Sequence, residues 1–160
     1  MRFSMFESPI GELILSGDDH GLTAIAFADS NKAPRIDSTW SRDDRAFTRV
    51  ADQLSAYFAG HLTQFELDLA PRGTPFQQRV WEALQRIPFG ATTTYSRLAG
   101  ALGDPHATRA VGLANGRNPL PIVIPCHRVI GADGTLTGYG GGLQRKQWLL
   151  AHEGVALRVS

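Results

Sequence analysis

Residues 119–130, with the sequence PLPIVIPCHRVI, restrict the conformation of this chain more than any other segment. The prolines in this segment fix the backbone before and around the only cysteine, because a proline ring locks φ. The aliphatic residues between the prolines favour burial. Cys126 is therefore expected to have little conformational freedom, and such preorganisation is what a reactive atom needs.

Cys126 has two interpretations. A lone buried cysteine commonly serves as a small hydrophobic residue. His127 follows it directly, however, and an imidazole can accept the thiol proton to give the nucleophilic thiolate. Adjacent side chains on an extended segment point to opposite sides, so we expect a bridging water between the thiol and the imidazole. A single cysteine cannot form an internal disulfide, which predicts a reducing, cytoplasmic setting.

Glu153 is an acidic residue near the end of an apolar helical stretch, residues 149–154. A carboxylate at a helix C-terminus is poorly placed against the helix dipole. One interpretation is a solvated terminal charge. The other is a carboxylate compensated by a protonatable imidazole, which would make Glu153 the acceptor that orients a histidine base.

Composition predicts a globular protein, since 42% of the 160 residues are hydrophobic and 19% are charged. No apolar run approaches the ~18 residues that a membrane span needs, and residues 1–6 lack the apolar stretch of a signal peptide. The net charge is −4 over residues 1–73 and +5 over residues 74–160. This asymmetry places the basic surface on the second half, where a DNA backbone would bind, although ordinary scatter of charges gives the same pattern.

The first part of the chain predicts a small sheet and a helix. Strands are expected at residues 2–6, 12–16 and 22–27, separated by turn-forming residues. Residues 29–42 are polar and irregular. Asp43 or Asp44 can begin a helix whose apolar residues recur at helical spacing until Gly60. Alternation over residues 65–69 predicts a half-buried edge strand. A linker at residues 70–73 then divides the chain into domains 1–70 and 74–160.

The second domain opens with a well-marked helix. Thr74 is a predicted N-cap, Pro75 occupies the first helical position and Gln77 completes a capping box. Residues 88–90 end this helix.

Two short helices follow, at residues 95–102 and from Pro105 to about Asn115, with Asp104 as the cap of the second. The predicted buried face of the second helix comprises Ala107, Ala110, Val111 and Ala114, and the opposite face comprises Thr108, Arg109 and Gly112. This arrangement is a helix-turn-helix, in which the second helix enters a DNA groove, or else a plain helical hairpin.

Residues 125–130, PCHRVI, resemble the active-site motif of the O6-alkylguanine-DNA alkyltransferases, the methylated-DNA–protein-cysteine methyltransferases. The similarity continues in order and spacing through the second half, at residues 76–81, 87–90, 95, 109–112, 118–119, 138–139 and 149–154. The first half resembles the family only weakly, mainly at residues 8–11 and 52–60.

The resemblance implies an α+β fold. A small N-terminal β-sheet with a helix, ribonuclease H-like, would support a mostly helical C-terminal domain that carries a winged helix-turn-helix. It also implies that Cys126 attacks the alkyl carbon on guanine O6 in double-stranded DNA and forms a thioether, so that each molecule reacts once. O4-alkylthymine is a second candidate substrate. No cofactor and no membrane are expected, and no metal, because family zinc sites use cysteines near the N-terminus. The expected state is a monomer, and cooperative binding on DNA stays open.

The resemblance assigns a role to individual residues. His127 would act as the base through water, with Glu153 orienting it. Tyr95 would hydrogen-bond the extruded guanine, although a core aromatic is the alternative. Arg109 would fill the space that the extruded nucleotide leaves. Asn118 would hold the turn before the cysteine segment, a role compatible with that of a pre-proline turn residue. The remaining DNA-binding candidates are Thr108, Gly112, Asn115 and Arg117, and the substrate-pocket candidates are Pro121, Val129, Gly138, Tyr139 and Gly140.

Gly140 departs from many animal members of the family, which place a serine after the loop tyrosine. The smaller residue is expected to admit bulkier alkyl groups. Three other functions compete with alkyl transfer. A protein that only binds lesions would not need Cys126, a cysteine hydrolase would need an oxyanion hole that no motif marks, and a helix-turn-helix regulator would leave the proline-flanked cysteine unexplained.

Overall fold

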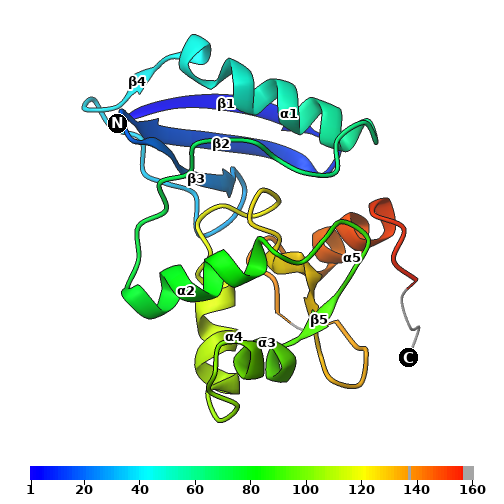
Figure 1. Cartoon of the computed structure of the whole chain (residues 1–160). Helices are drawn as coiled ribbons and strands as arrows, with labels where there is room; N and C mark the ends of the chain where they lie inside the picture. Colours follow the sequence, from blue (N-terminus) through cyan, green and yellow to red (C-terminus); the bar gives the residue numbers. More distant parts are fainter. Residues whose placement is uncertain (137, 157–160) are drawn as a thin grey trace. The chain divides into compact units, whose positions relative to one another are not determined.

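The computed structural model describes residues 1–136 and 138–156. The chain forms two compact units, Met1–Arg72 and Gly73–Ser160, and each is described by itself. The elements of both units are labelled along the chain in Figure 1. Within the described residues, no helix is long and apolar enough to cross a membrane.

The N-terminal unit is built on a sheet with the strand order β3-β2-β1-β4. The strands are β1 (Arg2–Ser8), β2 (Gly11–Asp18), β3 (Gly21–Phe27) and β4 (Ser41–Arg42). β1, β2 and β3 pair in antiparallel register, while β4 runs parallel to β1. The three predicted strands are confirmed, each longer than expected. β4 was missed because it is a two-residue strand within the polar segment.

The predicted edge strand at residues 65–69 is wrong. Only an isolated bridge forms there, between Leu22 and Leu69. The side chain of Gln53 occupies both backbone groups of Glu66, accepting from its N–H at 2.8 Å and donating to its carbonyl at 2.9 Å. A side chain thus supplies the hydrogen bonds that a neighbouring strand would otherwise provide. Residues 65–69 nevertheless alternate between half-buried and exposed positions, as the sequence pattern predicted.

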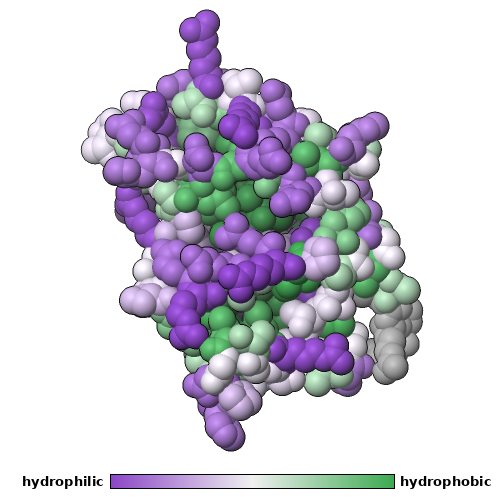
Figure 2. All heavy atoms as spheres, viewed as in Figure 1, coloured by the Kyte–Doolittle hydropathy of each residue, from purple (hydrophilic) through white to green (hydrophobic). Residues whose placement is uncertain are grey.

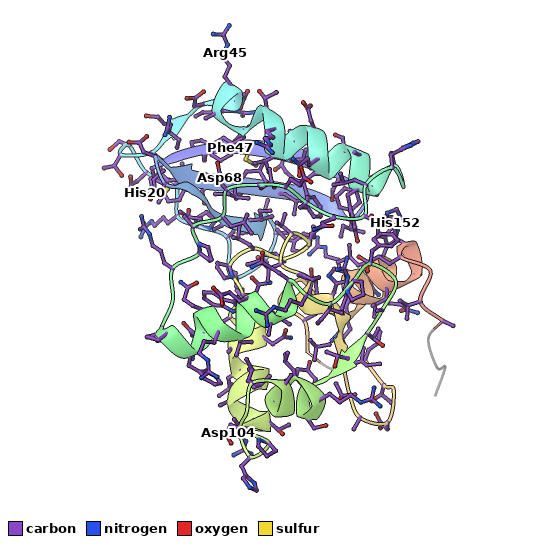
Figure 3. All side chains as sticks on the ribbon, viewed as in Figure 1. His20, Arg45, Phe47, Asp68, Asp104 and His152 are labelled. Carbon is purple, nitrogen blue, oxygen red and sulfur yellow. The ribbon has the colours of Figure 1, made fainter. Side chains whose placement is uncertain are left out.

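Helix α1 (Thr48–Phe58) follows a 3₁₀ turn, η1 (Asp44–Phe47), and Asp43 caps that turn by accepting from Ala46 N at 3.2 Å. In Figure 1, α1 runs along one face of the sheet, and Figure 3 shows Arg45 of η1 pointing away from it. The apolar stripe of α1 is buried at Val50, Leu54 and Tyr57. Figure 2 shows hydrophilic side chains alternating with hydrophobic patches over the outside of this unit.

The C-terminal unit is mainly helical. Its elements are α2 (Pro75–Leu84), β5 (Thr93–Thr94), α3 (Tyr95–Ala101), α4 (Thr108–Gly116), the 3₁₀ turn η2 (Cys126–Arg128), β6 (Val129–Ile130) and α5 (Leu143–His152). The capping box of Thr74 and Gln77 is present as predicted. Trp81 of α2 donates its indole N–H to the carbonyl of Ala114 at 2.9 Å, which ties α2 to α4. β5 and β6 form a small parallel pair.

The second helix of the helix-turn-helix differs from the prediction in two respects. It begins at Thr108 and not at Pro105, because Asp104 caps a tight turn by accepting from His106 N at 3.2 Å. Figure 3 shows Asp104 in this turn. Ala110, expected on the buried face, is exposed. The buried positions of α4 are Val111, Ala114 and Asn115.

Candidate active site and nucleic-acid interface

Cys126 follows a buried turn that leads away from α4. Asn118 crosslinks this turn, since its Nδ2 donates to the carbonyl of Ile124 at 2.8 Å and its Oδ1 accepts from Leu120 N at 3.0 Å. Ile122 has φ = 75° and is buried, and a β-branched residue in this region of φ is strained. The position of Cys126 is therefore set by a rigid backbone, and its side chain is itself buried.

His127 and Glu153 meet inside the C-terminal unit. His127 Nε2 lies 2.7 Å from Glu153 Oε2, and both side chains are fully buried. Burial lowers the pKa of His127, while its hydrogen bond to Glu153 raises it, and the pKa stays below its usual value. A neutral His127 carries its proton on Nε2, donates it to the carboxylate, and keeps Nδ1 as an acceptor. That Nδ1 is buried, without a hydrogen-bond partner among the described residues.

The sequence predicted that an imidazole alone compensates the charge of the Glu153 carboxylate. In the structure, Arg128 also binds this carboxylate. Arg128 Nε donates to Glu153 Oε1 at 2.7 Å, and its Nη2 donates to Oε2 at 3.0 Å. Its Nη1 donates to the carbonyl of Ile87 at 2.6 Å. The carboxylate is therefore held by a buried guanidinium on one side and by the imidazole on the other. The sequence signal for the Arg128–Glu153 ion pair was the position of Glu153, because a carboxylate at a helix C-terminus needs a nearby cation.

The expectation of an extended backbone at the cysteine is wrong. Residues Cys126–Arg128 form a 3₁₀ turn, so the alternation of side chains assumed for a strand does not apply here. A water between the thiol and the imidazole stays a prediction.

Lys146 is a second buried cation that the sequence interpretation missed. It lies on α5 with its side chain fully buried, and its Nζ donates to the carbonyl of Val129 at 2.6 Å. Burial lowers the pKa of Lys146 to about 8, and the nearby charge of Cys126 acts in the opposite direction. Lys146 therefore binds the segment that follows Cys126 to α5.

A cleft of about 650 Å³ opens beside this buried cluster. Its lining residues are Tyr95, Thr108, Arg109, Gly112, Asn115, Gly116, Gly138 and Tyr139. The structure thus brings together, from α3, α4 and the loop before α5, seven of the residues that the sequence interpretation singled out.

The other candidates lie outside this lining. Arg117 is exposed at the C-terminal end of α4, and Gly140 is exposed in its loop. Pro121 is half-buried and Val129 is fully buried. Cys126 is connected to the cleft through Asn115, whose Nδ2 donates to the Cys126 carbonyl at 3.4 Å. Within the part of the chain that the structure describes, no cluster of histidine, cysteine and acidic residues could hold a metal ion.

Comparison with known proteins matches both units of the chain to one family. Residues 75–155 match the model of the 6-O-methylguanine DNA methyltransferase DNA-binding domain, and residues 1–71 match its ribonuclease-like domain. The chain belongs to the 6-O-methylguanine DNA methyltransferase family. Methylated-DNA–protein-cysteine methyltransferases of Methanosarcina acetivorans and Mycolicibacterium paratuberculosis are 50% and 54% identical to it. Each alignment spans 96% of this chain, and 99% and 92% of those proteins respectively.

Solved structures of family members share the fold of the chain. The Mycobacterium tuberculosis OGT in complex with DNA superimposes with a TM-score of 0.89 at 50% identity, over 96% of this chain and 92% of that one. The α+β architecture and the family resemblance inferred from the sequence are confirmed. The sequence suggested only a weak resemblance of the first half to the family. Residues 1–71 in fact match the ribonuclease-like domain of the methyltransferase family.

Proposed function

We propose that this chain repairs DNA by transferring the alkyl group from O6 of guanine to the sulfur of its own Cys126, once per molecule. The observation that carries the proposal is the position of Cys126, held by a rigid turn beside the His127–Glu153 pair and adjoining the cleft. The relatives at about half identity, named methylated-DNA–protein-cysteine methyltransferases, support the same reaction. O4-alkylthymine is a second candidate substrate.

The buried groups account for the proton that leaves the thiol in this reaction. His127 Nδ1 takes the thiol proton of Cys126 through a water, and Glu153 stabilises the imidazolium that results. The thiolate attacks the alkyl carbon, the carbon–O6 bond breaks as the carbon–sulfur bond forms, and the electron pair stays on guanine. The guanine anion then takes up a proton from water at N1. Tyr95 donates a hydrogen bond to the departing base, which develops negative charge. Reversal would require cleavage of a thioether, so the protein is consumed.

The exposed face of α4 supplies the contact with double-stranded DNA. The reacting carbon lies inside the base stack, so the nucleotide has to leave the helix before it reaches Cys126. Arg109, exposed at the edge of the cleft, fills the vacated space. Thr108, Gly112 and Arg117 lie along the same helix, and their mostly small side chains allow close approach to a groove.

The loop before α5 covers the alkyl group. Gly138 and Tyr139 line the cleft. Gly140 follows them outside the lining, and its small size is expected to admit groups larger than methyl. Asn118 and Pro121 act on the reaction by holding the turn, and Val129 by binding Lys146. The protein is expected to act as a monomer in the cytoplasm, where its thiol stays reduced.

Analysis of the DNA product tests the proposal. A duplex with one O6-methylguanine is incubated with excess protein, digested, and its nucleosides are quantified. We expect guanine to replace O6-methylguanine with the wild type and not with Cys126→Ser. Unchanged O6-methylguanine with the wild type contradicts the proposal and favours a protein that only binds the lesion.

A further inference from the structure

The N-terminal unit contains a cavity of its own, with a volume of about 330 Å³. Its walls are the first residue of β1, the end of β2, the start of β3, residues of η1 and α1, and residues 67–68. Phe47 and Asp68, which both line it, are labelled in Figure 3. Every lining residue belongs to Met1–Arg72, so the cavity is complete within this unit.

Gly17 explains why the sheet leaves space at this point. Alternate residues of a strand face the same side, so Gly17 continues the row of Leu13 and Leu15 on β2. The two leucines are fully buried, whereas Gly17 has no side chain to fill its position. A Cβ added to Gly17 would lie 2.6 Å from the carbonyl oxygen of Gly21. The close approach of these two backbones therefore keeps the cavity open.

The floor of the cavity is apolar. Leu22, Phe47 and Val50 line it, and their exposed fractions are 4%, 5% and 7%. An apolar group that enters the cavity is removed from water at this floor, which favours binding. The volume lies at the lower end of the ~300–1,000 Å³ of small-molecule sites, so the cavity suits a ligand smaller than a nucleotide.

Four charged residues also line the cavity, and only two of them are neutralised. Arg2 and Asp18 each form an ion pair with a residue of opposite charge, at 2.5 and 2.6 Å. Arg49 on α1 and Asp68 beside β3 are exposed, and their side chains have no ion pair or hydrogen bond with any residue in ranges 1–136 and 138–156. The cavity thus offers one free cation and one free anion, among its described lining, above an apolar floor.

We propose that this cavity binds a free α-amino acid with an apolar side chain. The apolar side chain lies on the floor, the carboxylate pairs with the Arg49 guanidinium, and the ammonium group pairs with the Asp68 carboxylate. A guanidinium presents parallel N–H donors that match the two oxygens of a carboxylate. The inference is independent of the alkyl transfer proposed for Cys126.

The charges of the cavity disfavour ligands of a single sign. A phosphate group would be repelled by two carboxylates, those of Asp18 and Asp68. A simple amine would leave Arg49 without a counter-charge, and a simple carboxylate would leave Asp68 without one. A zwitterion satisfies both residues at once.

Titration of the intact, ¹⁵N-labelled protein with L-leucine tests the proposal, with amide chemical shifts as the readout. We expect saturable shifts at residues that line the cavity, among them Gly17, Gly21 and Ala46. Arg49→Gln and Asp68→Asn should each raise the dissociation constant about tenfold, because each loses one charge-assisted contact. Absence of saturable shifts in the wild type, or shifts only at residues outside the cavity, overturns the inference.

Two analogues of leucine test each charge separately. 4-Methylpentanoate lacks the ammonium group, and 3-methylbutylamine lacks the carboxylate. Asp68→Asn should not weaken binding of 4-methylpentanoate, and Arg49→Gln should not weaken binding of 3-methylbutylamine, because the missing group was the partner of the replaced residue. If each substitution weakens binding of all three compounds by the same factor, neither charge contacts the ligand and the assignment is wrong.

Matched substitutions outside the cavity provide the controls. Arg45→Gln and Asp52→Asn make the same changes of charge at exposed residues of η1 and α1 that do not line the cavity. Figure 3 shows Arg45 pointing away from the sheet. Both controls should bind L-leucine with the wild-type dissociation constant. A loss in the controls equal to that in Arg49→Gln and Asp68→Asn would show that only net charge matters, and would overturn the inference.

Discussion

At the scale of single residues, the centre of the C-terminal unit is a buried cluster of charges. Glu153 binds both His127 and Arg128, and all three side chains are almost wholly removed from water. Such a cluster is stable only as long as every member keeps its partner, because an uncompensated buried charge is costly. The same contacts hold the imidazole of His127 in place, so the proposed chemistry depends on contacts that also stabilise the fold.

Replacing Arg128 by methionine should strongly destabilise the protein. Arg128→Met leaves the buried Glu153 carboxylate without its bidentate partner, and we expect the free energy of unfolding to fall by about 3–5 kcal/mol. Urea titration followed by circular dichroism measures the change. Arg42→Met is the matched control, because Arg42 and Asp44 form an exposed pair at 3.0 Å that water screens, and the expected loss is much smaller. Equal losses in the two variants would contradict the account.

Lys146 predicts a pH dependence of stability in the alkaline range. Burial lowers its pKa from 10.5 to about 8 in the folded protein. Between these values the unfolded chain binds more protons than the folded one, so the free energy of unfolding should rise with pH across this window. We expect the rise in the wild type to exceed that in Lys146→Met by about 2–3 kcal/mol. Parallel pH profiles of the two proteins in urea titrations would show that Lys146 does not carry this shift.

At the scale of elements, some residues of α4 line the cleft and others are exposed to solvent. Arg109 and Arg117 are both exposed on or beside this helix, but only Arg109 lines the cleft. Their different positions predict different effects on the reaction.

Arg109→Ala should reduce repair of duplex DNA far more than reaction with free O6-benzylguanine, which needs no extrusion from a helix. We expect at least a tenfold difference between the two losses, in rates measured under single-turnover conditions. Arg117→Ala should weaken affinity for damaged and undamaged duplexes alike, since we propose that Arg117 contacts a phosphate. If Arg109→Ala loses the same factor on both substrates, Arg109 does not assist extrusion.

Short sequence motifs predicted helix and strand ends correctly where those ends depend only on residues close in sequence. The capping box of Thr74 and Gln77 marked the start of α2 correctly. The start of α4 was misplaced because Asp104 and Pro105 are good helix-starting residues that here serve a turn. The edge strand predicted at residues 65–69 does not form, because Gln53 takes both backbone hydrogen bonds of Glu66 and only one bridge to β3 remains.

The chemistry of the site was predictable only in part. Cys126, His127 and Glu153 were proposed as site residues from the rigid cysteine segment and the family resemblance, and the structure places His127 and Glu153 in contact. Arg128 and Lys146 were not assigned roles, because their partners lie 25 and 17 residues away and only the fold brings them together. The buried Asn115 was placed on the DNA-binding helix from the sequence, but its contact with Cys126 emerges only from the packing.

At the scale of the whole molecule, the reaction should change the stability of the protein that performs it. Cys126 is buried, so a methyl group on its sulfur adds volume next to the side chains that bury it. Overpacking of this kind costs about 1–3 kcal/mol. We expect the methylated protein to unfold several degrees below the unmodified one in differential scanning calorimetry. An unchanged or higher Tm would mean that the site already has room for the added group.

The central claim is that Cys126 accepts one alkyl group and is then spent. Intact-protein mass spectrometry after mixing with an excess of duplex containing O6-methylguanine tests it most directly, with peptide mapping to locate the change. The account predicts one added methyl group per molecule, on Cys126, and none on Cys126→Ala. More than one guanine restored per molecule of protein, or a methyl group on any other residue, would contradict it.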